Sequence, residues 1–131
     1  MPGEKNLAIL LKSLNPILLS ETYVFCLLPG GRYGDLQNSE PIASFMEEEG
    51  LSLVLTKTQA ERQKLSYVGE YRAISLKVFS SLDAVGMTAA ISAKLTQYNI
   101  SANVIAAFNH DHVFVNAQDA DEAFALLANF S

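Results

Sequence analysis

The second half of the chain shows the clearer pattern of hydrophobic and polar positions. Residues 71–79 alternate between apolar and polar positions, with Ser75 and Lys77 on the polar side, which predicts a half-buried strand. A helix over about residues 84–98 follows, because its apolar residues recur at i, i+3, i+7, i+11 and i+14. We expect Asp83 to cap this helix. The core-facing stripe consists of Ala84, Met87, Ile91, Leu95 and Tyr98.

Two strands and a last helix complete this half. Residues 102–107 and 112–115 are predicted to be strands around a turn at residues 109–111. Asp119 and Glu122 have the spacing of a capping-box variant that opens the last helix. The order β-α-β-β-α is typical of an α+β, ferredoxin-like fold. Because a sixth element is missing, we expect the two sheets of the protein to exchange or share edge strands.

The first half contains similar parts. The expected elements are a helix over about 4–14, a strand over 22–28, a loop over 30–39, a helix from 41 to 50, a strand over 51–56, and a short helix with a connector over 57–70. The helix from Pro41 is expected because Ile42, Phe45 and Met46 would share one face. The chain is therefore divided into an N-terminal module, residues 1–68, and a C-terminal module, residues 69–131.

Composition restricts the possible functions. The 131 residues are 50% hydrophobic and 18% charged, which excludes a disordered chain. Nine basic residues against 14 acidic ones give a net charge of −5, so a phosphate backbone would be repelled and nucleic-acid binding is not expected. No apolar run reaches the roughly 18 residues of a membrane span, and no secretory signal is recognised. The single cysteine, Cys26, fits a reducing compartment. We expect a cytoplasmic protein without a membrane partner.

Residues 79–86, Phe-Ser-Ser-Leu-Asp-Ala-Val-Gly, resemble the signature of the ACT domain, in which a strand ends in Asp-x-x-Gly and a helix opens. The resemblance continues in register over residues 91–101. Residues 105–115 resemble a segment of tandem ACT proteins, a group that includes the cytosolic arginine sensors. In this segment, Ala106 and Ala107 replace the Ser-Thr that the family often has, so a hydroxyl contact to a ligand is in doubt.

The first half resembles the N-terminal ACT-like partner of short bacterial two-module proteins, especially over residues 23–26 and 48–55. The resemblance implies two ferredoxin-like ACT modules of β-α-β-β-α-β type, packed side by side. It further implies a regulatory protein, not an enzyme, that binds a free amino acid at an interface between ACT modules and forms a homo-oligomer, expected to be a dimer. The alternative is a ligand-free structural or interaction module that forms homo-oligomers. The identity of the amino acid stays open, as does whether one chain or two would form the site.

The candidate ligand site combines the loop before the helix with the turn between the last two strands. A helix N-terminus suits a carboxylate, and Asp111 is an acceptor for an ammonium group. The predicted ligand-binding residues are Phe79, Ser80, Ser81, Leu82, Asp83, Val85, Gly86, Phe108 and Asp111. Several also have a purely structural interpretation. Asp83 would cap the helix, Gly86 would permit close packing, Asp111 would favour the turn, and the two phenylalanines would belong to the core.

Other motifs give weaker signals. His110 and His112 would lie on one side of an extended backbone, but a closed zinc site needs four ligands, so no metal site is predicted. The glycine-rich residues 30–34 lack the form of a phosphate-binding loop. No residue pattern pairs an activated nucleophile with a base, so neither enzymatic activity nor a cofactor is expected.

Overall fold

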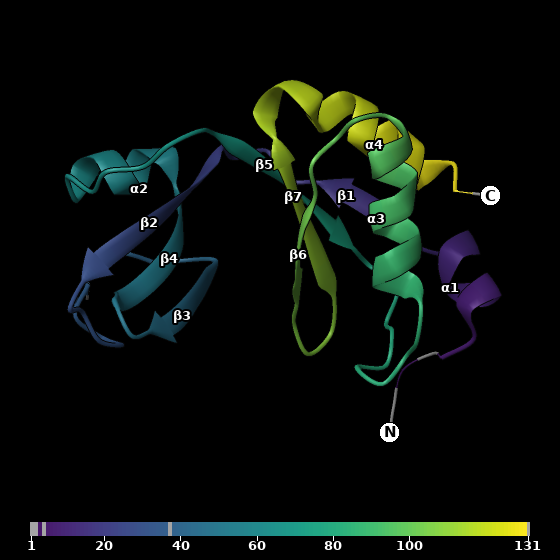
Figure 1. Ribbon diagram of the computed structural model, residues 1–131, viewed down its shortest axis with the longest axis horizontal. Helices are drawn as coiled ribbons and strands as arrows, with labels where there is room; N and C mark the ends of the chain where they lie inside the picture. The colour runs from purple at the N-terminus through teal and green to yellow at the C-terminus, as the bar shows by residue number, and fades with distance from the viewer. Residues whose placement is uncertain (1–2, 4, 37, 131) are drawn as a thin grey trace. The chain divides into compact units, whose positions relative to one another are not determined.

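In a computed structural model of the protein, which describes residues 3, 5–36 and 38–130, the chain forms two compact units. One unit combines residues 1–20 with 72–131, and the other consists of residues 21–71. Both contain strands and helices, which confirms the predicted α+β class (Figure 1). None of the helices in the described part of the chain is long and apolar enough to cross a membrane.

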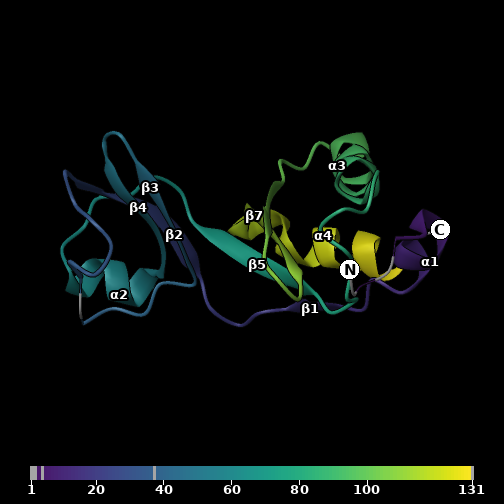
Figure 2. The same cartoon turned by 90° about the horizontal axis from the view of Figure 1, so that it is seen from below.

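The unit of residues 21–71 contains a three-stranded antiparallel sheet. Its order is β3 (Ala43–Glu47), β4 (Gly50–Thr56) and β2 (Tyr23–Pro29). Helix α2 (Lys57–Arg62) packs against β2 and β4 (Figure 2). Alternate strand residues share a face, so one face of the sheet meets the helix in a small core. The buried residues of this core are Val24, Cys26, Leu51, Leu53, Leu55 and Ala60.

The helix predicted from Pro41 to Gly50 is wrong, because β3 occupies its central residues. A two-residue turn, Glu48–Glu49, joins β3 to β4. Gly50 has φ +142°, and a Cβ there would lie 2.2 Å from the carbonyl oxygen of Leu28. Only glycine fits this position without a shift of the backbone. Pairing with β4 therefore overrides the helical spacing of the apolar residues in this segment.

Because this segment is a strand and not a helix, the apolar side chains expected on one helix face lie elsewhere. A helix would have buried one face, whereas β3 is the outermost strand of its sheet. The three residues that indicated the helix are 37%, 73% and 42% exposed: Ile42, Phe45 and Met46.

The other unit joins the start of the chain to the second half. Strand β1 (Pro16–Leu18) pairs antiparallel with β5 (Tyr71–Leu76). Beyond β5 lie β7 (Asp111–Asn116) and then β6 (Asn103–Ala106), which gives the order β1-β5-β7-β6. The strand missing from the second half is thus supplied by the first, in one direction, whereas we had expected the two sheets to exchange or share edge strands. For this reason the compact units differ from the predicted modules.

The three helices of this unit share one core with the sheet (Figure 1). They are α1 (Leu7–Lys12), α3 (Met87–Gln97) and α4 (Ala120–Ala128), and α1 packs against α3. Their core includes Leu10 and Leu14 from the start of the chain, which are 0% and 2% exposed. A 3₁₀ turn, Ala117–Asp119, precedes α4, and the Asp119 side chain makes no capping hydrogen bond. The last helix therefore begins where predicted, but without the predicted cap.

Strand β5 is buried on both faces, contrary to its predicted alternation. Ile74 and Leu76 belong to the helix-covered core, and Ser75 on the opposite face is 1% exposed. The Ser75 hydroxyl has no hydrogen-bond partner within the described structure. Lys77 is exposed, as predicted for the polar side.

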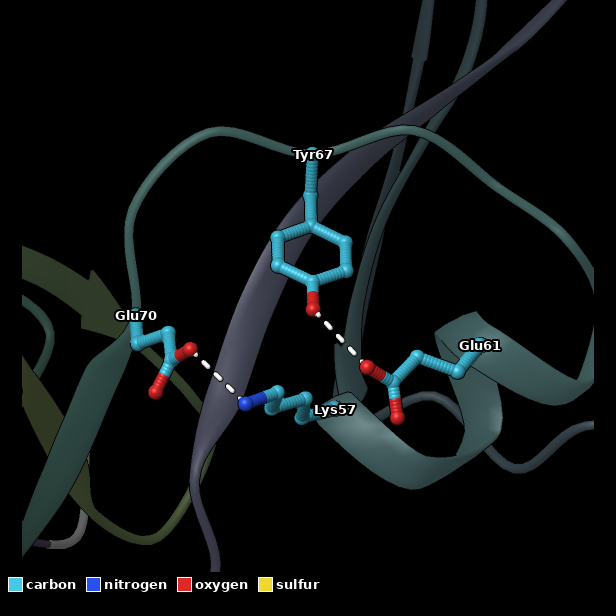
Figure 3. Close-up of polar contacts among 4 residues, drawn as sticks. All are labelled: Lys57, Glu61, Tyr67 and Glu70. Atoms are coloured by element: carbon cyan, nitrogen blue, oxygen red, sulfur yellow. Dashed lines mark hydrogen bonds and ion pairs between the residues drawn. The ribbon is translucent and has the colours of Figure 1, made fainter.

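The connector between α2 and β5 is held by two polar contacts (Figure 3). Lys57 Nζ lies 2.9 Å from Glu70 Oε2, and the Tyr67 hydroxyl donates to Glu61 Oε2 at 3.2 Å. The hydrogen bond and the charge of Glu70 raise the pKa of Lys57. Because both contacts lie at the surface, they position the connector but contribute little to the free energy of folding.

Candidate functional site

The loop that leads from β5 into α3 lies beside the beginning of β7. Ser80 and Ser81 in this loop are buried, and Asp111 at the start of β7 is 9% exposed. The Ser80 hydroxyl donates a hydrogen bond to Asp111 Oδ2 at 3.3 Å. This contact joins two segments that sequence analysis had assigned to one site.

Helix α3 begins at Met87, three residues later than predicted. Ser81 Oγ accepts a hydrogen bond from the Asp83 N–H at 3.1 Å, and the Ala84 N–H donates to the Ser81 carbonyl oxygen at 3.0 Å, which forms a turn. The N-cap of α3 is Gly86, whose φ of +99° lies in the left-handed region. The prediction that Asp83 caps the helix is therefore wrong. Glycine offers no side-chain acceptor to the first N–H groups of α3.

A small cavity of about 80 Å³ opens where the loop, the N-terminus of α3 and β7 meet. It is lined by Ser80, Ser81, Leu82, Ala84, Met87, Thr88, Ala106 and Asp111. Sites for small organic ligands usually have volumes of roughly 300 Å³ or more. The cavity is thus large enough only for the small polar end of a ligand, and the remainder of the ligand would lie outside it.

The structure brings together part of the predicted ligand-binding set. Four of the nine residues line the cavity: Ser80, Ser81, Leu82 and Asp111. The other five do not line it: Phe79, Asp83, Val85, Gly86 and Phe108. Four apolar members of the predicted set are 37%, 57%, 83% and 65% exposed: Phe79, Leu82, Val85 and Phe108. The two phenylalanines therefore lie outside the core.

Four residues of the cavity were absent from the predicted set. Met87 was assigned to the core stripe of the helix, and its side chain serves both the core and the cavity. Thr88 follows it in the first turn of α3 and carries no distinguishing pattern. Ala106 marks the departure from the family pattern, and the cavity has a methyl group there in place of a hydroxyl. Ala84 was assigned to the helix, but α3 begins only at Met87, so Ala84 belongs to the loop that lines the cavity.

Burial controls the electrostatics of the cavity. It raises the pKa of Asp111 above the ordinary value of 3.8, while the Ser80 hydrogen bond and the positive charges of His112 and His110 act in the opposite direction. Burial lowers the pKa of His112, and the charges of Lys77 and His110 lower it further. Over the residues described, no three His, Cys, Asp or Glu side chains are grouped so that they could hold a metal ion.

An ACT-domain family model matches residues 2–72, and a second ACT-domain model matches residues 68–129. A crystal structure of a Vibrio cholerae protein of unknown function, described as a possible transport protein, is 44% identical; the match covers 96% of each chain with a TM-score of 0.86. An Agobacterium tumefaciens protein is 19% identical over 87% of this chain and 86% of that one, with a TM-score of 0.70.

The regulatory subunit of aspartate kinase from Thermus thermophilus, in its ligand-free form, shares the fold. It is 9% identical, with a TM-score of 0.61 over 88% of this chain and 95% of that one. No match was found among proteins of curated function. The family matches confirm the resemblance of both halves, and the chain therefore belongs to the ACT-domain family, with two ACT domains in tandem.

Proposed function

We propose that the protein is a non-enzymatic regulatory protein of the cytoplasm that binds a free amino acid at the cavity between the loop and β7. The observation that supports this most directly is Asp111, a carboxylate that is largely buried yet held by a neutral hydroxyl group. Burial disfavours this charge, and His112 and His110 offset the effect only in part, because the pKa of Asp111 is still raised; a closer cationic partner would stabilise the carboxylate. The ammonium group of an amino acid would supply that partner.

The other polar group of the ligand also has a place in this proposal. The N-terminus of α3 presents N–H groups and a partial positive charge, which suit an α-carboxylate. Gly86 leaves these groups without a side-chain acceptor. An ammonium at Asp111 and a carboxylate at α3 would orient the ligand with its side chain directed out of the cavity.

The exposed apolar residues beside the loop support a site completed by a second ACT domain. The cavity of about 80 Å³ leaves the ligand side chain outside. Leu82 and Val85 in this loop are 57% and 83% exposed, and exposed apolar side chains beside a site can be covered by a partner. We therefore propose a homodimer in which the partner copy covers the ligand. The fold shared with an aspartate kinase regulatory subunit agrees with a regulatory role.

Thermal unfolding against the twenty amino acids, each at about 5 mM, tests this proposal. A ligand present at a hundredfold excess over its Kd adds roughly 2.7 kcal/mol, which raises Tm by several degrees. Asp111→Asn should abolish the response to the one stabilising amino acid. Asp83→Asn is the matched control, because it neutralises an exposed carboxylate of the same loop that does not line the cavity.

The alternative function, a ligand-free module that forms homo-oligomers, gives a different result. None of the twenty amino acids would then raise Tm, while sedimentation would still detect an oligomer. The replacement of the family's hydroxyl by Ala106 is the feature that favours this alternative. A response of equal size in the wild type and in Asp111→Asn would place any ligand elsewhere and refute the proposed site.

A further inference from the structure

Strand β3 offers an open backbone edge to solvent. It is the last strand in the order β3-β4-β2, and within the described chain no strand pairs with its outer side. The N–H and C=O groups of an unpaired edge are a template for a further strand. Phe45 and Met46 on β3 are 73% and 42% exposed, so apolar side chains accompany the free backbone.

Three devices that protect edge strands, lysine, proline and a β-bulge, are absent from the five residues of β3. Natural edges carry lysine, proline or a bulge, each of which prevents another strand from pairing. The five residues of β3 include neither lysine nor proline. Its pairing with β4 runs without interruption from Ala43↔Val54 to Glu47↔Gly50, so no bulge twists the edge away. The edge is therefore competent for strand addition.

Charge selects the type of partner. Residues 33–56 contain five acidic residues and neither lysine nor arginine. The acidic residues are Asp35, Glu40, Glu47, Glu48 and Glu49. All three glutamates at the end of β3 are exposed, and the Ser52 hydroxyl donates a hydrogen bond to Glu47. A strand that pairs with β3 therefore has three exposed carboxylates beside one of its ends.

A second copy of this chain is a poor occupant of the edge. Two β3 strands paired antiparallel about Phe45 would set Glu47 of each copy opposite Ala43 of the other, so that the glutamates of each copy meet the segment that contains the acidic Glu40. Like charges brought together at an interface oppose association. We infer that β3 instead binds an extended basic segment of a partner protein as an added strand, with apolar side chains of that segment against Phe45.

This surface is separate from the proposed amino-acid site. None of the residues of β3 lines the cavity at Asp111. The experiments on the two proposals therefore test them independently. An amino acid that stabilises the protein says nothing about β3, and a peptide bound at β3 says nothing about Asp111.

The experiment measures fluorescence anisotropy of a labelled nine-residue peptide of alternating valine and lysine, titrated with the full chain. Two control peptides isolate the two sources of binding. One carries glutamate in place of lysine, and the other keeps the lysines but is N-methylated at every backbone amide, so that neither of its edges can donate hydrogen bonds to a strand. The inference requires that only the unmodified basic peptide binds.

Two protein variants locate the binding. Glu48→Gln with Glu49→Gln removes two charges at the end of β3 and should weaken binding about fivefold. Asp121→Asn with Glu122→Gln removes two exposed charges from α4 and should leave the Kd unchanged. Phe45→Lys adds a repelling charge to the exposed edge and should abolish binding.

Four outcomes would overturn the inference. No binding of the basic peptide would show that the edge is not used in this way. If the N-methylated peptide binds as tightly as the unmodified one, strand pairing is not the cause of binding. If the β3 and α4 double variants weaken binding equally, the peptide is attracted to the acidic protein in general and not to β3. Self-association that is lost in Phe45→Lys, measured by sedimentation, would identify a second copy as the occupant.

Discussion

Replacement of Leu10 by alanine should destabilise a core built mainly from residues more than sixty positions away. Leu10 lies on α1 and is 0% exposed. It belongs to the cluster that contains Ile74 of β5 and Ile91 of α3. Leu10→Ala removes apolar atoms from this cluster and leaves a cavity beneath α1.

The expected cost follows from the burial of the side chain. Leucine-to-alanine changes in a rigid core cost about 3–5 kcal/mol, because lost burial and the residual cavity add together. Ile9→Ala on the same helix is the matched control, since Ile9 is 51% exposed and its truncation should cost less than about 1 kcal/mol. The difference is large compared with a total stability of about 5–15 kcal/mol. It should lower Tm by roughly 10 °C or more.

Hydrogen exchange followed by mass spectrometry locates the effect. In Leu10→Ala, the amides of β5, α3 and β7 should exchange faster, because they share a core with Leu10. The amides of β2 and β4 should change less, because these strands belong to a different core. The reasoning would be refuted if the loss of protection stayed within α1, or if it were equal in both compact units.

Three further predictions concern single positions. Gly50→Ala should lower the free energy of unfolding in denaturant titrations by about 2–4 kcal/mol, because the new Cβ would lie 2.2 Å from a carbonyl oxygen. Gly34→Ala is the control and should cost only about 1 kcal/mol, because Gly34 has φ +96° but an added Cβ would have nothing within 4 Å. If Gly50→Ala and Gly34→Ala lower the free energy of unfolding equally, the clash is not the cause. Ser75→Ala should raise that free energy by up to about 1 kcal/mol, because it removes a buried hydroxyl without a partner; a loss of stability would show that the hydroxyl is satisfied. Asp111→Asn should be more stable than the wild type without ligand at neutral pH. The raised pKa means that the folded wild type binds the proton more tightly than the unfolded chain, so it loses stability as pH rises from 3.8 through the raised value. A stability difference that does not change across this pH range would refute the argument.

The second half of the chain was predictable because its elements carry local signals. The alternation over residues 71–79 predicted a strand there, and the helical stripe from Met87 to Leu95 predicted which side chains face the core. Strand β5 and helix α3 form in these segments, although β5 is buried on both faces. The motif at residues 79–86 indicated the ACT family before any contact was known. Local periodicity locates these two elements because each packs at least one face against the core.

The first half shows where local signals fail. Apolar residues at 42, 45 and 46 satisfy a helical spacing, yet the segment is a strand because β4 supplies a partner along its whole length. Strand β1 gives no strand signal in three residues, and it is defined by its pairing with β5 far along the chain. Such pairings depend on contacts between distant segments, which no window of sequence contains.

The candidate site follows the same division. Sequence placed Ser80, Ser81 and Asp111 in one set, and the structure joins them around a cavity. The late start of α3 at Gly86, the burial of Asp111 and the small volume of the cavity were not encoded locally. Each depends on how the loop, the helix and β7 pack together, because desolvation and cavity shape are properties of atoms brought together from separate parts of the chain.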